Sequence, residues 1–326
     1  MRYNRIVTTV VFFASISTYF TLFITPANGT PFIGENMSIN RSTVNDSLPN
    51  VQVSSSSDKV QVVASFYPIL DFVKKVGGDR VEVSSLIPVG IEPHDYEPTI
   101  QQIQNAQTAD MLVINGAGFE EKWIKNINAR SVLDTSVGLN LTRSGLESDQ
   151  SADPHIWLDP ILAKQQVENI RDGLIKVDPA NSAYYKENAN RFISDLGILD
   201  KTIKSELSSC EKKDFIAFHN AFSYFSKRYG LTQHSIQGVS PEADVLPQRL
   251  QQIVSLARDI GLDTIYTEEL VDPRFANVIA QEIPNGKVLV LSPIEGIDKD
   301  EQNAGVDYQD KMKENIENLK VGLKCN

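Results

Sequence analysis

Short apolar segments alternate with helical segments along most of this chain, starting at Val60. Parallel strands need a long crossover between them, and a helix is the usual crossover, so this alternation predicts parallel sheets with helices packed on their faces. We expect strands at 60–66, 81–86, 111–115, 131–134, 216–219, 264–267 and 288–291, and helices at 69–76, 99–109, 120–128, 161–176, 222–229, 247–260 and 308–320. The predicted fold class is therefore α/β.

One helical segment is much longer than the others. It covers about 180–208 and carries large apolar side chains at helical spacing, among them Tyr185, Phe192 and Leu196. Since it separates two α/β halves, we expect an N-terminal lobe at 59–177, a connector helix at 178–209 and a C-terminal lobe at 210–326. The length of 326 residues is enough for two domains of roughly 100–200 residues each.

The first 58 residues differ in composition from the rest. Residues 1–27 combine Arg2 and Arg5 with an uncharged, mostly apolar run, which predicts a cleaved signal peptide or a retained N-terminal anchor. Residues 28–58 are rich in Ser, Thr and Asn and contain four Asn-x-Ser/Thr sequons, so we expect an exposed tether. Both segments predict that the remaining chain lies outside the cytoplasm, either secreted or anchored at the cell surface.

Charge and cysteine content exclude some kinds of site. The net charge of −11 argues against nucleic acid as a partner, because that binding depends on cationic side chains that meet phosphates. The two cysteines, Cys210 and Cys325, are too few for a disulfide framework or a cysteine-rich zinc site. A single disulfide between them and two reduced cysteines are equally compatible with the sequence.

Three of the four histidines lie at the end of a predicted strand or in a loop stiffened by proline or aromatic residues. They are His94 in EPHDYEP, His155 in DPHIWLDP and His219 in AFHNAFSYF. Each Asp-Pro pair around His155 restricts the backbone, and a metal site needs ligands that are held in this way. Imidazole nitrogens favour zinc and neighbouring transition metals. No local spacing joins the three histidines, so on this ground alone they are also compatible with three unrelated loop or core positions.

Longer segments connect these histidines with one protein family. The segments GIEPHDYEPT, ADMLVINGAGFE, DPHIWLDP, FIAFHNAFSYFSKRYGL and SPEADV follow one another along the chain. Through them, the chain from about Val60 to Leu323 resembles the substrate-binding proteins of zinc- and manganese-type ABC importers. The resemblance implies two α/β lobes joined by one long helix, with a metal site in the cleft between the lobes. It also implies that His94, His155 and His219 bind the metal, and that a histidine at position 219 favours zinc over manganese.

The fourth ligand is where the chain departs from the family it resembles. That family usually has an aspartate after the last core strand, whereas this chain has Ser292, and a neutral hydroxyl is a poor zinc ligand. Water, Glu295, Glu268 or Glu269 could complete the coordination of the ion.

Other polar residues near these motifs are candidates for supporting roles. Asp95, Glu97, Asp159 and Glu242 could accept a histidine N–H, although a surface or capping role suits each of them better. We expect His234 to be structural or exposed.

Together with the predicted location, the resemblance implies a monomeric, non-catalytic receptor outside the cytoplasm. It is expected to capture Zn²⁺, or alternatively Mn²⁺, and to deliver the ion to an ABC permease in the membrane that a cytoplasmic ATPase drives. Affinity should fall in acid, because imidazole must be neutral to bind the ion. The alternatives are an extracellular zinc-dependent hydrolase, which would need a nearby carboxylate base, and a metal-binding adhesin, which the tether with its glycosylation sequons suggests.

Overall fold

The computed structural model describes residues 59–143, 152–241 and 245–326. The predictions for the N-terminal segment 1–27, the tether 28–58 and Glu242 lie outside these residues. Within the described residues, no helix is both long enough and apolar enough to cross a membrane. The described residues belong to a single compact unit, so the residue limits of the two lobes and the connector stay predictions.

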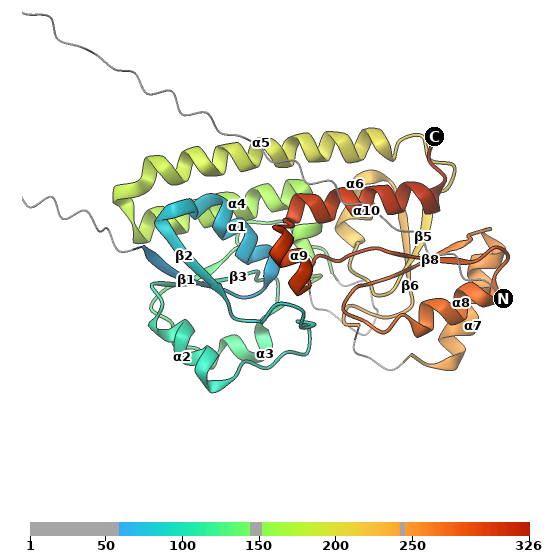
Figure 1. Cartoon of the computed structure of the whole chain (residues 1–326), viewed down its shortest axis with the longest axis horizontal. Coiled ribbons are helices and arrows are strands. Elements are labelled where there is room, and N and C mark those ends of the chain that lie inside the picture. The colour runs from blue at the N-terminus through green and yellow to red at the C-terminus, as the bar shows by residue number, and fades with distance from the viewer. Residues whose placement is uncertain (1–58, 144–151, 242–244) are drawn as a thin grey trace, which may run out of the picture. The chain divides into compact units, whose positions relative to one another are not determined.

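Two four-stranded parallel sheets form the framework, which confirms the predicted fold class. The first contains β1 (Val60–Ala64), β2 (Val81–Ser85), β3 (Met111–Ile114) and β4 (Val132–Asp134), in the order β2-β1-β3-β4. The second contains β5 (Asp214–Ala217), β6 (Thr232–Ser235), β7 (Thr264–Thr267) and β8 (Lys287–Val290), in the order β6-β5-β7-β8 (Figure 1). The two halves thus repeat one strand order. In each half the second strand lies on one side of the first strand and the third strand lies on its other side, so the order in which strands are added reverses between the first and third strands.

The central strands are apolar because helices or loops cover both of their faces. β3 is buried at all four positions, whereas in the edge strand β2 exposed residues alternate with buried or half-buried ones. In such open α/β sheets, ligands bind at the carboxyl ends of the strands, near the reversal of strand order. This rule directs attention to the loops that follow β2, β4, β5, β7 and β8.

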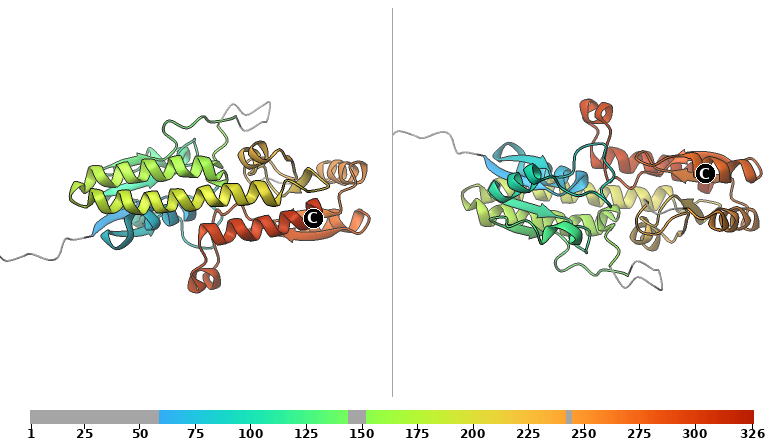
Figure 2. Two further views of the ribbon diagram at one scale, coloured as in Figure 1. Left: turned by 90° about the horizontal axis from the view of Figure 1, so that it is seen from above. Right: turned by 90° about the horizontal axis from the view of Figure 1, so that it is seen from below.

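Helices fill the remaining layers. They are α1 (Tyr67–Gly77), α2 (Ile100–Thr108), α3 (Glu121–Ile124), α4 (Pro160–Val177), α5 (Ser182–Glu206), α6 (Ser223–Tyr229), α7 (Pro247–Asp259), α8 (Arg274–Glu282), α9 (Lys299–Ala304) and α10 (Tyr308–Leu323), with short 3₁₀ turns η1 (Gly78–Arg80), η2 (Ile156–Leu158) and η3 (Pro179–Asn181). The long helix α5 contacts α1 and α4 of the first half and α10 of the second (Figure 2). It therefore connects the two halves, as the sequence predicted.

Several short elements were not predicted from the sequence. β6, α8 and α9 were missed, and the helix expected at 120–128 is shorter, at Glu121–Ile124. β6 has the sequence TQHS, which lacks apolar alternation because the strand lies at the edge of its sheet. His234 lies within this strand, where its Nε2 atom is 2.9 Å from a carboxylate oxygen of Asp214.

A disulfide joins Cys210 and Cys325, which decides between the two alternatives for the cysteines. The bonded residues are 115 positions apart, and they also form an isolated antiparallel bridge. The disulfide therefore ties the chain just after α5 to the end of the chain just after α10.

Candidate metal centre

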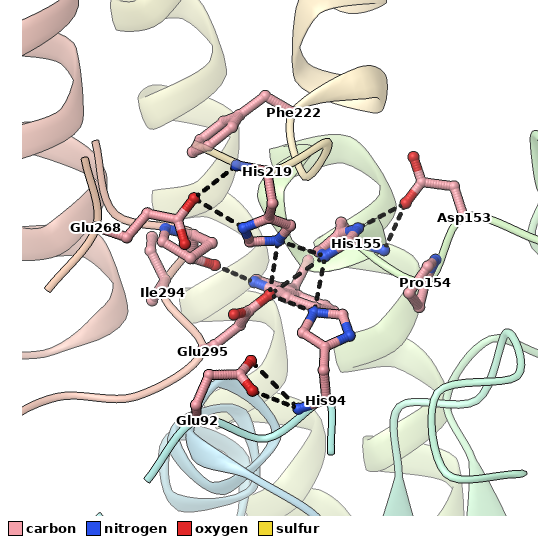
Figure 3. Close-up of polar contacts among 12 residues, drawn as sticks. Glu92, His94, Asp153, Pro154, His155, His219, Phe222, Glu268, Ile294 and Glu295 are labelled. Carbon is pink, nitrogen blue, oxygen red and sulfur yellow. Dashed lines mark hydrogen bonds and ion pairs between the residues drawn. The ribbon is translucent and has the colours of Figure 1, made fainter. Parts of the chain in front are cut away.

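His94 lies in the loop between β2 and α2. Its backbone N–H donates to both carboxylate oxygens of Glu92, at 3.2 and 3.0 Å, and its carbonyl accepts a hydrogen bond from Lys122 at 3.3 Å. The imidazole packs edge-to-face against Phe119, with ring centroids 5.1 Å apart. The ring of His94 faces the other two predicted histidine ligands (Figure 3).

His155 lies directly before the 3₁₀ turn η2, in the segment DPHIWLDP that leads into α4. Oδ1 of Asp153 accepts hydrogen bonds from the backbone N–H of His155, at 3.0 Å, and from its ring Nδ1, at 2.8 Å. Near the end of the segment, Asp159 is the N-cap of α4 and accepts hydrogen bonds from two backbone N–H groups of that helix. Because Nδ1 donates to Asp153, the lone pair of the neutral imidazole lies on Nε2.

His219 follows β5 and repeats this arrangement with a residue that is distant in the sequence. Oε1 of Glu268 accepts from the backbone N–H of His219, at 3.1 Å, and from its ring Nδ1, at 2.7 Å. Glu268 is the first residue after β7, which pairs with β5, so neighbouring strands bring the two residues together. In both halves one carboxylate oxygen thus fixes the main chain and the ring of a histidine, and leaves Nε2 available.

Glu295 reaches the site from the loop after β8. The hydroxyl of Ser292 accepts a hydrogen bond from the backbone N–H of Ile294 at 3.0 Å, while the main chain of Ser292 makes two hydrogen bonds of 2.7 Å with the Asn315 side chain. Ile294 then has a φ of 57°, a left-handed conformation that is unusual for a β-branched residue. This turn brings the carboxylate of Glu295 to the three histidines, while Ser292 serves to hold the turn.

The four side chains converge on one point. Oε1 of Glu295 lies 3.1, 3.2 and 3.4 Å from the Nε2 atoms of His94, His155 and His219, respectively. Nε2 of His155 lies 3.3 Å from Nε2 of His94 and 3.2 Å from Nε2 of His219. A tetrahedral zinc ion with ligand distances of ~2.0–2.1 Å requires neighbouring ligand atoms about 3.3–3.4 Å apart. The five distances therefore agree with the edges of a tetrahedron of zinc ligands.

The arrangement of these four side chains favours a bound cation. With Nδ1 of His155 and His219 engaged by carboxylates, the neutral rings direct lone pairs toward one another and toward Glu295. Lone pairs at this separation repel one another unless a positive charge lies between them. The site is also buried, since the side chains of His155 and His219 are fully enclosed and that of His94 is 8% exposed.

The shifts in pKa reflect the same competition between burial and charge. Burial lowers the pKa of His94, whereas at His155 and His219 contacts with carboxylates outweigh burial and raise the pKa. Burial alone would raise the pKa of Glu295, but the neighbouring His94 and His219 hold it well below its usual range. In chemical terms, the site stabilises positive charge at its centre.

Of the acidic residues that the sequence offered as ligands or supporting groups, only some lie near the three histidines. Among the described residues, the cluster comprises His94, His155, His219 and Glu295, and Glu268 lies behind His219 on its Nδ1 side. Of the remaining candidates, Glu269 pairs with Lys311, Asp95 with Lys122 and Asp159 with Arg228, while Glu97 is exposed.

Sequence reasoning missed Asp153 as the carboxylate that holds His155. A signal was present, because Asp153 lies two residues before His155 in the motif that was singled out. A side chain at this spacing can return to the backbone N–H two residues later, as aspartate often does in turns. The motif therefore supplies a candidate ligand and the group that orients it.

An acidic pocket adjoins the cluster. Glu92, Glu268, Glu269 and Glu295 line it, together with apolar residues of the loops after β7 and β8. Carboxylates gathered at one opening create a negative potential that attracts cations.

Comparison with known proteins agrees with this geometry. Residues 62–322 match the family described as zinc-uptake complex component A, periplasmic (ZnuA). The chain is 36% identical over 286 residues to the high-affinity zinc uptake system protein ZnuA of Bacillus subtilis, and the match covers 82% of this chain and 89% of that protein.

Solved structures show the same fold. The Zn(II)-bound ZnuA-like domain of Streptococcus pneumoniae AdcA is 32% identical, with a TM-score of 0.71, and the match covers 81% of this chain and 99% of that domain. The match covers 58% of the longer AdcA structure from the same organism. A third structure is the laminin-binding protein Lmb of Streptococcus agalactiae, which is described as a bifunctional protein with adhesin and metal transporting activity. It is 30% identical to this chain with a TM-score of 0.75, and the match covers 81% of this chain and 99% of Lmb. The chain therefore belongs to the ZnuA family of zinc-uptake components.

Proposed function

We propose that this protein captures Zn²⁺ outside the cytoplasm and delivers it to an ABC permease. His94, His155, His219 and Glu295 are the proposed ligands, and Glu268 orients His219 without binding the ion. Family membership supports this assignment, and so does the similarity to a domain solved with Zn(II).

One observation carries the choice of zinc. Five of the six distances among the three Nε2 atoms and Oε1 of Glu295 are 3.1 to 3.4 Å, in agreement with tetrahedral coordination. Three nitrogens and one carboxylate oxygen also suit zinc better than they suit Mn²⁺, which favours oxygen-rich sites. Mn²⁺ is accordingly the weaker competitor in this proposal.

The same ligand set supports binding without catalysis. A catalytic zinc usually keeps one position open for water, whereas four protein ligands complete a tetrahedron. The family is one of transport components rather than enzymes. The hydrolase alternative therefore has no support from the geometry of these four residues.

The partners and location follow from the family. A component of an uptake complex needs a permease that accepts the ion, and we propose that this chain acts as a monomer. The family is described as periplasmic, which supports a location outside the cytoplasm. Anchoring through residues 1–27 and an additional role in adhesion stay separate predictions.

Calorimetric titration of protein stripped of metal tests the proposal. Zn²⁺ should bind at one site per chain, and a chelator of known affinity should be needed to measure the dissociation constant. His155→Ala and His219→Ala should each weaken binding at least tenfold, because each removes a ligand. His234→Ala is the matched control, since His234 lies in β6 and pairs with Asp214.

Two results would overturn the proposal. One is the absence of tight Zn²⁺ binding, or binding that survives both ligand substitutions. The other is a preference for Mn²⁺ when both ions are offered at equal concentration. Turnover of a model ester or phosphate by the zinc-loaded protein would instead support the hydrolase alternative.

A further inference from the structure

Trp157 lies two residues after the ligand His155 and is completely buried. Its ring contacts Phe66, Phe119 and the imidazole of His155, with ring centroids 4.9, 5.9 and 5.2 Å away. The preceding main chain is also held, because Asn115 donates a hydrogen bond to the carbonyl of Pro154 at 2.9 Å. Trp157 is thus fixed to the first half of the molecule together with His155.

Two hydrogen bonds connect Trp157 to the second half. Its indole N–H donates to the carbonyl of Pro293 at 2.7 Å, and its own carbonyl accepts a hydrogen bond from the hydroxyl of Tyr308 at 2.6 Å. Both bonds are buried. They hold the two ends of the segment Pro293–Tyr308, which contains Glu295.

The bond at Pro293 acts close to the carboxylate ligand. Pro293 has a restricted φ, and Ile294 has a left-handed φ of 57° that leaves it little freedom to adjust. The carbonyl that Trp157 holds belongs to the peptide group between these two residues. If this peptide group is displaced, the backbone of Glu295 therefore moves with it.

Other contacts place the same segment on the first half. The hydroxyl of Tyr67 donates to the carbonyl of Val306 at 3.1 Å, and Lys75 forms an ion pair with Asp307 at 2.6 Å. Ile294 packs into the core that the first half shares with α10. The segment thus belongs to the second half by sequence but rests against the first half.

We propose that Trp157 is a positioning residue of the metal site. Through its hydrogen bonds to both ends of the segment Pro293–Tyr308, it sets the position of Glu295 relative to His155. The inference rests on the proposed function of these residues as zinc ligands. Trp157 makes no contact with the ion in this arrangement, and its effect on binding passes through Glu295.

Trp157→Phe tests this role because it keeps an aromatic ring and removes the indole N–H. We expect the affinity for Zn²⁺ to fall about tenfold, the lower range for groups that orient metal ligands. In a Glu295→Ala background the same substitution should change affinity less than twofold, since the residue through which Trp157 acts is absent. The visible absorption of bound Co²⁺ should lose the intensity of a tetrahedral site in Trp157→Phe.

Two further variants make the test decisive. Trp123→Phe makes the same chemical change at the other tryptophan, in α3, and should leave the affinity and the Co²⁺ spectrum unchanged. Tyr308→Phe removes the second hydrogen bond to Trp157 by deleting one oxygen. It should lower affinity at least threefold in the wild-type background and have no effect with Glu295→Ala, and it carries the test if Trp157→Phe does not fold.

The outcomes separate this inference from the proposed function. Wild-type protein that does not bind zinc contradicts the proposed function. Normal binding by wild type together with unchanged binding by Trp157→Phe contradicts the role of Trp157 alone. An equal loss of affinity with and without Glu295 also overturns it, because Trp157 would then act through His155 or through general stability.

Discussion

Two carboxylates determine how two of the histidines face the centre of the site. Asp153 and Glu268 each accept from the backbone N–H and the ring Nδ1 of one histidine. Their placement leaves Nε2 as the available nitrogen and increases the electron density on the ring. At the scale of single residues, the site therefore depends on a carboxylate behind the ligand as well as on the ligand.

Glu268→Gln tests this dependence. Glutamine can still accept a hydrogen bond from Nδ1 of His219, but it lacks the negative charge that supports the ring. We expect zinc affinity to fall about tenfold in chelator competition. Glu282→Gln, at an exposed glutamate in α8, should bind zinc as the wild type does. An unchanged affinity in Glu268→Gln would show that Glu268 only holds the loop.

The sequence predicted the three histidines but could not choose the fourth member of the cluster. Glu268 and Glu295 both follow strands of the same sheet and were both candidates. The choice depends on backbone details after β7 and β8, above all the left-handed turn at Ile294. No local sequence pattern predicts such a turn at an isoleucine, because most residues found in the left-handed conformation are glycine or asparagine.

At the scale of elements, α1 carries a buried acid on the face where it meets the turn before α10. Asp71 is 8% exposed, and its Oδ2 atom has no hydrogen-bond partner among the described residues. Burial raises the pKa of Asp71 to about 6, although the neighbouring Lys75 acts in the opposite direction. The folded chain therefore holds this proton more tightly than the unfolded chain, in which aspartate has a pKa of about 3.9.

This shift predicts a pH dependence of stability. A raised pKa in the folded state means that stability is retained below pH ~4 and declines as pH rises toward ~6, with a total change of roughly 3 kcal/mol. Asp71→Asn removes the titration. The difference in free energy of unfolding between Asp71→Asn and the wild type should therefore shift in favour of the variant by roughly 2 kcal/mol from pH 4 to pH 7, as measured by urea denaturation. Asp79→Asn, at an exposed aspartate, should follow the wild type at both pH values.

The disulfide makes a second prediction at this scale. Cys210 and Cys325 are separated by 115 residues, so the bond restricts a long loop in the unfolded chain. Replacing both residues by serine should lower the free energy of unfolding by about 2–5 kcal/mol in chemical denaturation. Wild-type protein kept reduced serves as the control and should match the double variant. Equal stability of the oxidised wild type and the double variant would contradict the prediction.

Long, periodic elements could be predicted from the sequence and short polar ones could not. The helices at 161–176 and 247–260 were expected almost at their observed limits, because each has a proline near its start and an apolar face. β6 and α9 have only four and six residues with few apolar side chains. Their positions depend on strand pairing and on contacts between the halves, which the local sequence does not encode.

At the scale of the whole molecule, the four proposed ligands come from loops that are far apart in the sequence. His94 and His155 belong to the first half, and His219 and Glu295 to the second. An ion that binds all four residues therefore stabilises the arrangement of the two halves as well as each loop. Unfolding of the described chain should be coupled to loss of the ion.

Thermal unfolding provides the measurement. At a free Zn²⁺ concentration of about 100 times the dissociation constant, binding adds ~2.7 kcal/mol of stability. The midpoint temperature should then rise by several degrees, given ~2–4 °C for each kcal/mol in domains somewhat smaller than this one. His155→Ala should show no such rise at the same zinc concentration. A rise of equal size in that variant would place the bound ion elsewhere.

The carboxylates around the site influence which charge a bound ion should carry. Asp153, Glu268 and Glu295 bring three acidic groups to three imidazoles in an enclosed space. A divalent ion offsets two of these negative charges, whereas Na⁺ or K⁺ offsets only one, and uncompensated charge is costly in a buried site. On this ground we expect the site to favour a divalent ion over Na⁺ or K⁺ by charge as well as by the shape of the coordination sphere.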